Sequence, residues 1–212
     1  MHETSFDVII KLLREYTKQS PEPMTREIVA LYNKDPFLIL VSCLLSLQTR
    51  DVVTLPISMK LFQVVRTPQQ LLALPLSELE TIIKPINYYK TKAQRLRSVS
   101  QELLSRFSGK VPCSTQDLLS MKGIGIKTAH LVAAEAFDIP AICVDTHVHR
   151  LSNKWGLIQT KNPDETEKAL RMILPKKYWI EWNYLLVKWG QYTCKTKKIP
   201  CPQCHMIIKE LT

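Results

Sequence analysis

A lysine and an aspartate that lie eighteen residues apart are the side chains best suited to chemistry. Lys127 comes directly after a Gly-Ile-Gly-Ile stretch, and Asp145 opens an Asp-Thr-His triplet. A neutral lysine amine can attack an electrophilic carbon and form an imine. The start of a helix disfavours the ammonium form through the helix dipole. A nearby carboxylate could activate the amine or stabilise developing positive charge. Lys127 can also be read as a solvated helix lysine, and Asp145 as the N-cap of a helix over 146–155.

A glycine turn between two helices positions Lys127. The first helix is expected over 114–119, opened by Ser114 or Thr115, and the second begins at Ile126. Gly123 and Gly125 end the first helix and turn the chain, because glycine enters positive φ without a steric penalty. Backbone N–H groups at the start of the second helix suit an anionic phosphate.

A second cluster of reactive side chains lies near the end of the chain. Cys194, Cys201 and Cys204 are spaced Cys-x6-Cys-x2-Cys within a segment that also carries Lys195, Lys197, Lys198 and Pro200. Such a set suits metal ligation. The other three of the six cysteines occur singly and are expected to be reduced thiols.

The composition favours a polyanionic partner. Lys and Arg number 29 against 19 Asp and Glu, giving a net charge of +10 and a pI of about 9.3. No apolar run is long enough to cross a bilayer, and the charged N-terminus is unlike a signal peptide. We therefore expect no membrane association.

The periodicity predicts an all-α fold. The stretch 37–47 is apolar nearly all round after Asp35-Pro36, which indicates a buried central helix. Ser77-x-x-Glu80 is typical of a capping box at a helix start. We find no alternating strand and no internal repeat.

Together these motifs resemble the endonuclease III family of DNA glycosylases. The resemblance rests on the hairpin at 121–129, the Val-Asp-Thr-His at 144–147, the stretches 44–51 and 86–93, and the cysteine spacing. It covers roughly residues 35 to 205 in the family's order. It implies a base excision repair enzyme that removes oxidised pyrimidines from damaged double-stranded DNA and cleaves the abasic strand by β-elimination. Lys127 would then attack the sugar C1′, and Asp145 would be the family's essential aspartate.

The resemblance also implies two helical lobes with a DNA-binding cleft. One is a six-helix domain over 29–138, with the helix-hairpin-helix motif at 114–137. The other joins 1–28 to 139–212 and carries the cysteine loop at 194–210.

Several side chains are expected to bind DNA by the same resemblance. Gln48 and Tyr88 take the positions of the wedge residues that fill the space left by a flipped base. Asn87 stands where the family often has glycine, and is expected to tolerate positive φ. Tyr88 and Tyr89 can instead be core aromatics of a turn, and His147 a packing residue. The complete DNA-binding set is Gln48, Tyr88, Lys122, Gly123, Gly125, His147 and Lys195.

The chain departs from the family's pattern in the hairpin and in the cysteine loop. Lys122 replaces a proline, which adds a charge but loosens the turn, and Ile126 replaces a basic residue. The three cysteines match three ligands of the family's [4Fe–4S] cluster, but Glu210 stands in place of the fourth. Absence of a cluster is favoured over an atypical cluster, and zinc held with His205 is the least favoured. The chemistry at Lys127 needs no cofactor.

Two other functions remain open at this level. A relative acting on another damaged or mismatched base is one, although Lys127 and the short chain argue against it. A non-catalytic helix-hairpin-helix DNA-binding protein is the other. We expect a monomer that is cytoplasmic in a bacterium, and nuclear or mitochondrial in a eukaryote.

Overall fold

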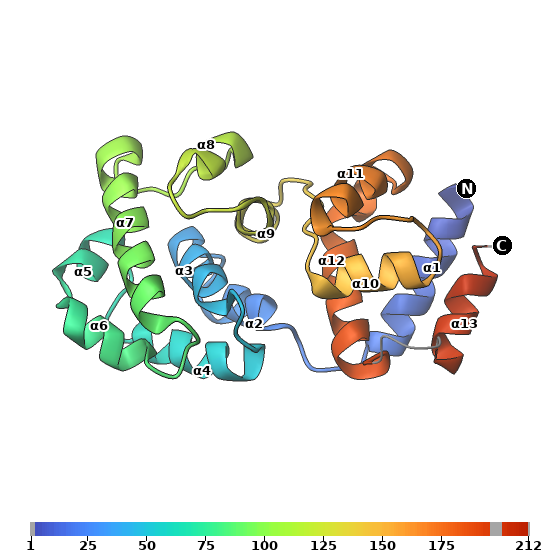
Figure 1. Ribbon diagram of the computed structural model, residues 1–212, viewed down its shortest axis with the longest axis horizontal. Helices are drawn as coiled ribbons and strands as arrows, with labels where there is room; N and C mark the ends of the chain where they lie inside the picture. Colours follow the sequence, from blue (N-terminus) through green and yellow to red (C-terminus); the bar gives the residue numbers. More distant parts are fainter. Residues whose placement is uncertain (1–2, 196–200, 212) are drawn as a thin grey trace. The chain divides into compact units, whose positions relative to one another are not determined.

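The computed structural model describes residues 3–195 and 201–211, and every regular element in these ranges is helical (Figure 1). This confirms the predicted all-α class. The helices are α1 (Glu3–Thr17), α2 (Met24–Leu31), α3 (Pro36–Ser46), α4 (Asp51–Leu61), α5 (Pro68–Ala73), α6 (Leu76–Ile83), α7 (Tyr89–Phe107), α8 (Thr115–Ser120), α9 (Ile126–Phe137), α10 (Thr146–Lys154), α11 (Pro163–Ile173), η1 (Lys176–Tyr178), α12 (Trp179–Lys188), η2 (Trp189–Thr193) and α13 (Pro202–Lys209). Within the described ranges, none of them is long and apolar enough to cross a membrane.

The chain packs as two units. Unit 1 joins Met1–Pro23 to Pro140–Thr212, and unit 2 is Met24–Ile139. Unit 2 thus begins at Met24 where residue 29 was expected, because α2 packs against α3, α4 and α9. It contains the eight helices α2 to α9 rather than six. Two of the eight, α5 and α8, have only six residues each.

The core of unit 2 is built around α3. Asp35 caps this helix by accepting hydrogen bonds from the backbone N–H groups of Phe37 and Leu38. Nine of its eleven residues are buried, and α2, α4, α7 and α9 pack against it. The predicted central helix is therefore confirmed.

The start of α6 corrects one expectation from the sequence. The helix begins at Leu76, its N-cap is Pro75 and no side chain caps it. Ser77 therefore lies inside the first turn, where its carbonyl accepts a hydrogen bond from the Thr81 hydroxyl. The predicted capping box does not form.

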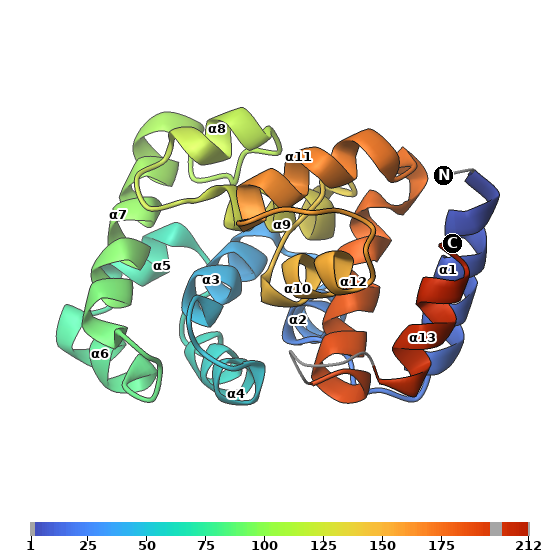
Figure 2. The same cartoon turned by 45° about the vertical axis from the view of Figure 1, so that its right-hand side comes forward.

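The core of unit 1 is aromatic. Trp155, Trp182 and Trp189 are buried and meet edge to face, with ring centroids 6.4 Å and 6.0 Å apart. Phe6 of α1 packs edge to face on Trp182 at 6.0 Å. Figure 2 shows α13 beside α1, and the Tyr16 hydroxyl donates to the Met206 sulfur across this pair at 3.1 Å. The N-terminal helix is thereby part of the C-terminal unit.

Candidate DNA-binding and catalytic site

The glycine hairpin (residues 121–126) joins α8 to α9 in unit 2. Ser114 caps α8 by accepting a hydrogen bond from the backbone N–H of Asp117. Gly123 has φ +92°, and the turn is closed by a bond from the N–H of Ile124 to the carbonyl of Met121. The predicted order of helix, turn and helix is confirmed.

The two hairpin glycines serve different purposes. Gly123 needs its lack of a side chain, because its φ is positive and a Cβ atom would lie 3.0 Å from Cγ of Arg95. Gly125 has φ −93° and ψ 170°, which any residue can adopt, and a Cβ there would meet nothing within 4 Å. The expectation that both glycines turn the chain is therefore wrong for Gly125. Its bare backbone instead leaves open space at the start of α9.

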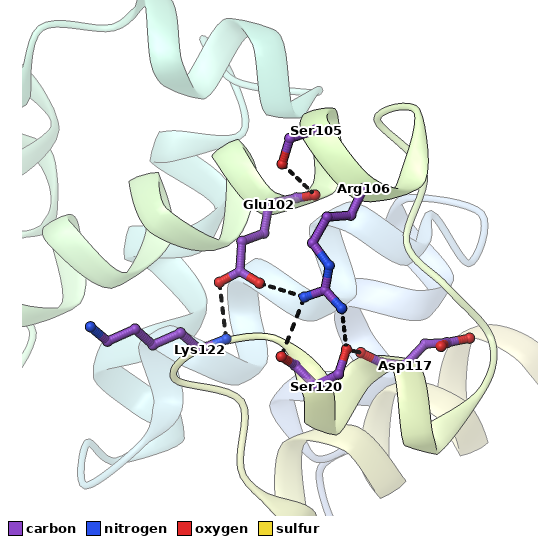
Figure 3. Close-up of polar contacts among 6 residues, drawn as sticks. All are labelled: Glu102, Ser105, Arg106, Asp117, Ser120 and Lys122. Carbon is purple, nitrogen blue, oxygen red and sulfur yellow. Dashed lines mark hydrogen bonds and ion pairs between the residues drawn. The ribbon is translucent and has the colours of Figure 1, made fainter.

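Two side chains of α7 brace the hairpin (Figure 3). One carboxylate oxygen of Glu102 accepts a hydrogen bond from the backbone N–H of Lys122 at 3.0 Å, and the other pairs with Arg106 at 2.8 Å. Arg106 also donates to the hydroxyl of Ser120 at 2.7 Å and to its carbonyl at 3.3 Å. We call this set the Glu102–Arg106 brace. It supplies an acceptor for the backbone N–H of Lys122, a group that a proline at this position would lack.

Lys127 is the second residue of α9 and is half-buried. The helix packs against α3, and the residues that follow Lys127 are buried through Glu135. Burial raises the pKa of the Cys43 thiol in α3 to about 12, and the nearby positive charge of Lys127 opposes that rise. Lys127 therefore lies at the boundary between the exposed start of α9 and its buried part.

Asp145 in unit 1 is the N-cap of α10, as predicted. Its side chain accepts hydrogen bonds from the backbone N–H groups of His147 at 2.9 Å and Val148 at 2.8 Å. Both bonds go to the same oxygen, Oδ1, so the cap does not use Oδ2. The carboxylate is thus oriented by its own helix.

His147 is half-buried against the π-helical segment η2. A Cβ atom at Gly190 would lie only 2.2 Å from Nδ1 of His147, so the ring occupies the space that a side chain would need. Arg150 lies 3.5 Å from the same nitrogen. His149 bonds to the Thr166 hydroxyl at 2.7 Å, in agreement with its expected structural role.

The two candidate wedge residues lie in exposed turns of unit 2. Gln48 follows α3 with φ +55°, and Tyr88 precedes α7 with φ +58° and 68% of its surface exposed. Asn87 was expected to tolerate positive φ, but the residue that adopts it in this turn is Tyr88. The reading of Tyr88 as a core aromatic is also wrong, given its exposure.

Three cysteine sulfurs meet in unit 1. The Sγ atoms of Cys194, Cys201 and Cys204 lie within 4.8 Å of one another, and the group could hold a metal. Burial raises the pKa of Cys194, but hydrogen bonds from Cys204 and Arg150 and the charge of Lys154 lower it overall. Arg150 and Lys154 approach its sulfur to 3.6 Å and 3.5 Å. These positive groups suit a thiolate.

The remaining residues of the cysteine loop do not join this group. Among the residues that the structure describes, neither Glu210 nor His205 belongs to the set whose ligand atoms converge, and both are exposed. Lys195 is exposed next to Cys194. Lys197, Lys198 and Pro200 lie outside the described residues.

Sequence reasoning missed three residues of α7, Lys92, Glu102 and Arg106, whose side chains bond to the turns that carry the candidate site residues. Glu102 and Arg106 show only the i, i+4 spacing of an ordinary surface ion pair. Lys92 lies within the recognised 86–93 stretch, but its spacing on α7 gives no sign that it is buried.

Comparison with known proteins places this geometry in a family. Residues 41–176 match the model of the HhH-GPD superfamily base excision DNA repair protein, a stretch that contains Gln48, Tyr88, Lys127 and Asp145. Endonuclease III of Thermotoga maritima is 40% identical over 190 residues, covering 87% of this chain and 89% of that protein.

Two solved structures extend the likeness over the whole chain. A non-covalent Endonuclease III–DNA complex has a TM-score of 0.84 at 29% identity, covering 100% of this chain and 98% of that one. A trapped Endonuclease III–DNA covalent intermediate also has a TM-score of 0.84 at 29% identity, with coverage of 100% and 99%. The chain therefore belongs to the HhH-GPD superfamily of base excision DNA repair proteins.

Proposed function

We propose that Lys127 is the nucleophile of a DNA glycosylase and AP lyase that removes oxidised pyrimidines from duplex DNA. The observation that carries this proposal is the place of Lys127 in the first turn of α9, directly after the glycine hairpin. The protein is a base excision repair enzyme of the endonuclease III type. Its relatives include a protein trapped as a covalent intermediate with DNA, which is the species that an imine-forming lysine would give.

The reaction begins at the sugar. The amine of Lys127 forms a bond to C1′, the glycosidic bond breaks, and the base leaves with the electron pair and takes up a proton. Opening of the sugar ring and loss of the second amine proton give an imine. Loss of a C2′ proton then expels the 3′ phosphate by β-elimination, and water hydrolyses the imine to regenerate Lys127.

Asp145 would serve the same reaction through the oxygen that its helix cap does not use. Oδ1 is held by two backbone N–H groups, so the carboxylate has a fixed orientation. Oδ2 could then accept a proton from the attacking amine, or stabilise the positive charge on the sugar as the base leaves.

The hairpin would hold a DNA phosphate. The start of a helix such as α9 suits an anion, because its backbone N–H groups and the positive end of the helix dipole lie there. The absence of a side chain at Gly125 leaves space for a phosphate to approach them. Gly123 would hold the turn, and Lys122, Lys195 and His147 would contribute to DNA binding.

Gln48 and Tyr88 would enter the duplex. Both are exposed, and tyrosine can stack on a base. Filling the space left by an extruded base reduces the cost of keeping that base outside the stack.

The cysteine group fits ligation by three thiolates rather than the four that a [4Fe–4S] cluster normally has. A cluster here would need a further ligand, and Glu210 is not part of the converging set in the described residues. The role of a bound metal would be to hold the loop that carries Lys195. No step of the proposed reaction passes through it.

Borohydride trapping tests the proposed function. The substrates are a duplex with one thymine glycol and a duplex with one abasic site, and the proteins are wild type, Lys127→Ala and the control Lys122→Ala. We expect a covalent adduct with wild type and Lys122→Ala, and none with Lys127→Ala. Base release without an adduct would instead indicate a monofunctional glycosylase. Binding without either product would leave a non-catalytic DNA-binding protein.

We propose that the enzyme acts as a monomer on damaged double-stranded DNA. The Thermotoga relative is bacterial, and the cytosol of a bacterium is the compartment that we propose.

A further inference from the structure

Two turns of unit 2 share an uncommon backbone conformation. Gln48 and Tyr88 both have left-handed φ values, +55° and +58°. For a residue with a side chain this conformation costs about 1–2 kcal/mol. Side chains persist there only when the surrounding structure holds them, and such positions gather at functional sites.

The first support is a buried lysine. Lys92, in the first turn of α7, is 4% exposed, and its ammonium donates to the carbonyls of Leu45 and Leu47 at 2.8 Å and 2.5 Å. It also donates to the hydroxyl of Thr49 at 3.0 Å. A protonated lysine has three N–H donors, and here it meets three acceptors. All three acceptors belong to the end of α3 and to the turn that carries Gln48.

The second support runs from the turn that carries Tyr88. The side-chain amide of Asn87 donates to the carbonyl of Gln48 at 2.6 Å, and the backbone N–H of Asn87 donates to the Thr49 hydroxyl at 3.3 Å. Thr49 therefore accepts from both Lys92 and Asn87. We call these contacts among Leu45, Leu47, Gln48, Thr49, Asn87 and Lys92 the Lys92 junction.

We propose that Thr49, Asn87 and Lys92 are positioning residues that hold Gln48 and Tyr88 as one rigid pair for insertion into the duplex. This inference rests on the proposed function of the two wedge residues. The hydrogen bonds of the junction join the main chain at residues 45–49 to residues 87–92, so neither turn can shift without breaking bonds to the other.

A rigid pair has a consequence for the energetics of base extrusion. Two loops that must be ordered at the moment of insertion would lose conformational entropy then. In this chain the junction orders both turns when the protein folds, so this entropy is lost before the protein binds DNA. Loss of the junction should therefore harm steps that open a duplex more than steps on DNA that is already open.

The test compares borohydride trapping on two abasic substrates, a duplex and the same strand alone. Thr49→Val removes the shared hydroxyl without changing the shape of the side chain, and Asn87→Ala removes the bond to the Gln48 carbonyl. We expect the trapping rate on the duplex to fall about tenfold for Thr49→Val and about fivefold for Asn87→Ala, as expected for the loss of hydrogen bonds to a charged and a neutral donor. The rate on the single strand should stay at the wild-type value.

Conservative and matched variants make the result specific. Thr49→Ser restores the hydroxyl and should restore the duplex rate. Lys90→Met removes an exposed positive charge from the same turn of α7 and should leave the ratio of duplex to single-strand rates unchanged.

Two outcomes would overturn the inference. One is a parallel loss on both substrates, which would indicate general damage to the fold. The other is an unchanged duplex rate in Thr49→Val. If the wild-type protein gives no adduct on either substrate, the proposed lyase function itself fails, and that result differs from both of these.

Discussion

Helix α7 supports two turns of unit 2, both of which we propose to contact DNA, in two different ways. Near its start, buried Lys92 holds the end of α3 and the turn of Gln48 through three hydrogen bonds, and Asn87 joins the turn of Tyr88 to them. Near its end, the Glu102–Arg106 brace holds the glycine hairpin with side chains that are 22% and 43% exposed. One support is therefore removed from water and the other is open to it.

The two supports differ because the backbone conformations of the two turns differ in energetic cost. Gln48 and Tyr88 carry side chains in a left-handed conformation, so their turns need strong bonds to persist. In the hairpin the left-handed position is a glycine, which costs little. An exposed ion pair, which contributes about 0–1 kcal/mol, is then sufficient to complete that turn.

The largest effect should follow from removal of the buried amine. Lys92→Met keeps an unbranched side chain but removes three hydrogen bonds from a charged donor, and we expect a loss of about 3 kcal/mol in the free energy of unfolding. Urea denaturation followed by circular dichroism would measure it. Lys90→Met should change the same quantity by less than about 0.5 kcal/mol. Equal losses in the two variants would remove the distinction between the buried and the exposed support.

The pH dependence of stability should depend on the same amine. Burial, assisted by the charge of Arg95, lowers the pKa of Lys92 from 10.5 to about 8. Between pH 8 and 10.5 the unfolded chain therefore binds a proton that the folded chain has released, so the free energy of unfolding should rise with pH in this window. The contribution is level below pH 8 and above pH 10.5. Denaturation of wild type and Lys92→Met at several pH values in this range gives the difference between their free energies of unfolding. A difference that stays constant with pH would contradict the lowered pKa of Lys92.

The two hairpin glycines should separate folding from DNA binding. Gly123→Ala places a Cβ in a left-handed conformation against Arg95 and should cost about 1–2 kcal/mol of stability. Gly125→Ala should fold as well as wild type, within about 0.5 kcal/mol, but bind an abasic duplex more weakly because the methyl group occupies the open space at the start of α9. Thermal melts and fluorescence anisotropy would measure the two quantities. Wild-type DNA affinity in Gly125→Ala would argue against a phosphate at this position.

The smallest effect should come from the exposed brace. Glu102→Ala removes the acceptor of the Lys122 N–H and the partner of Arg106, and should cost about 1 kcal/mol. In a Lys122→Pro background there is no N–H to satisfy, so the same substitution should cost less. A double-mutant cycle on the free energy of unfolding measures this coupling. A coupling energy of zero would show that the Glu102 carboxylate does not support the turn.

The parts of the fold that depend on near neighbours could be predicted from the sequence. Asp35 and Asp145 cap the helices that follow them, and Ser114 opens the first helix of the hairpin, because a cap involves only the next two or three residues. The apolar run after Asp35 likewise identified the buried helix of unit 2.

The positions that sequence reasoning misplaced depend on distant contacts. Asn87 has the side chain best suited to positive φ, yet Tyr88 adopts it, and the amide of Asn87 bonds instead to Gln48, 39 residues away. Ser77 could have capped α6 with a helix start at residue 78, but the helix starts two residues earlier, at Leu76. The local preference was outweighed in the first case by a bond that no local window contains.

The close approach of Gly190 to His147 makes position 190 intolerant of change. Any side chain there would meet the Nδ1, Cγ and Cβ atoms of His147, at 2.9 Å or less, and would displace the first turn of α10. Asp145 caps that turn with bonds to His147 and Val148. A saturation library at codon 190, selected for repair activity, should therefore return glycine alone, although this residue lies far along the chain from the carboxylate whose orientation it protects.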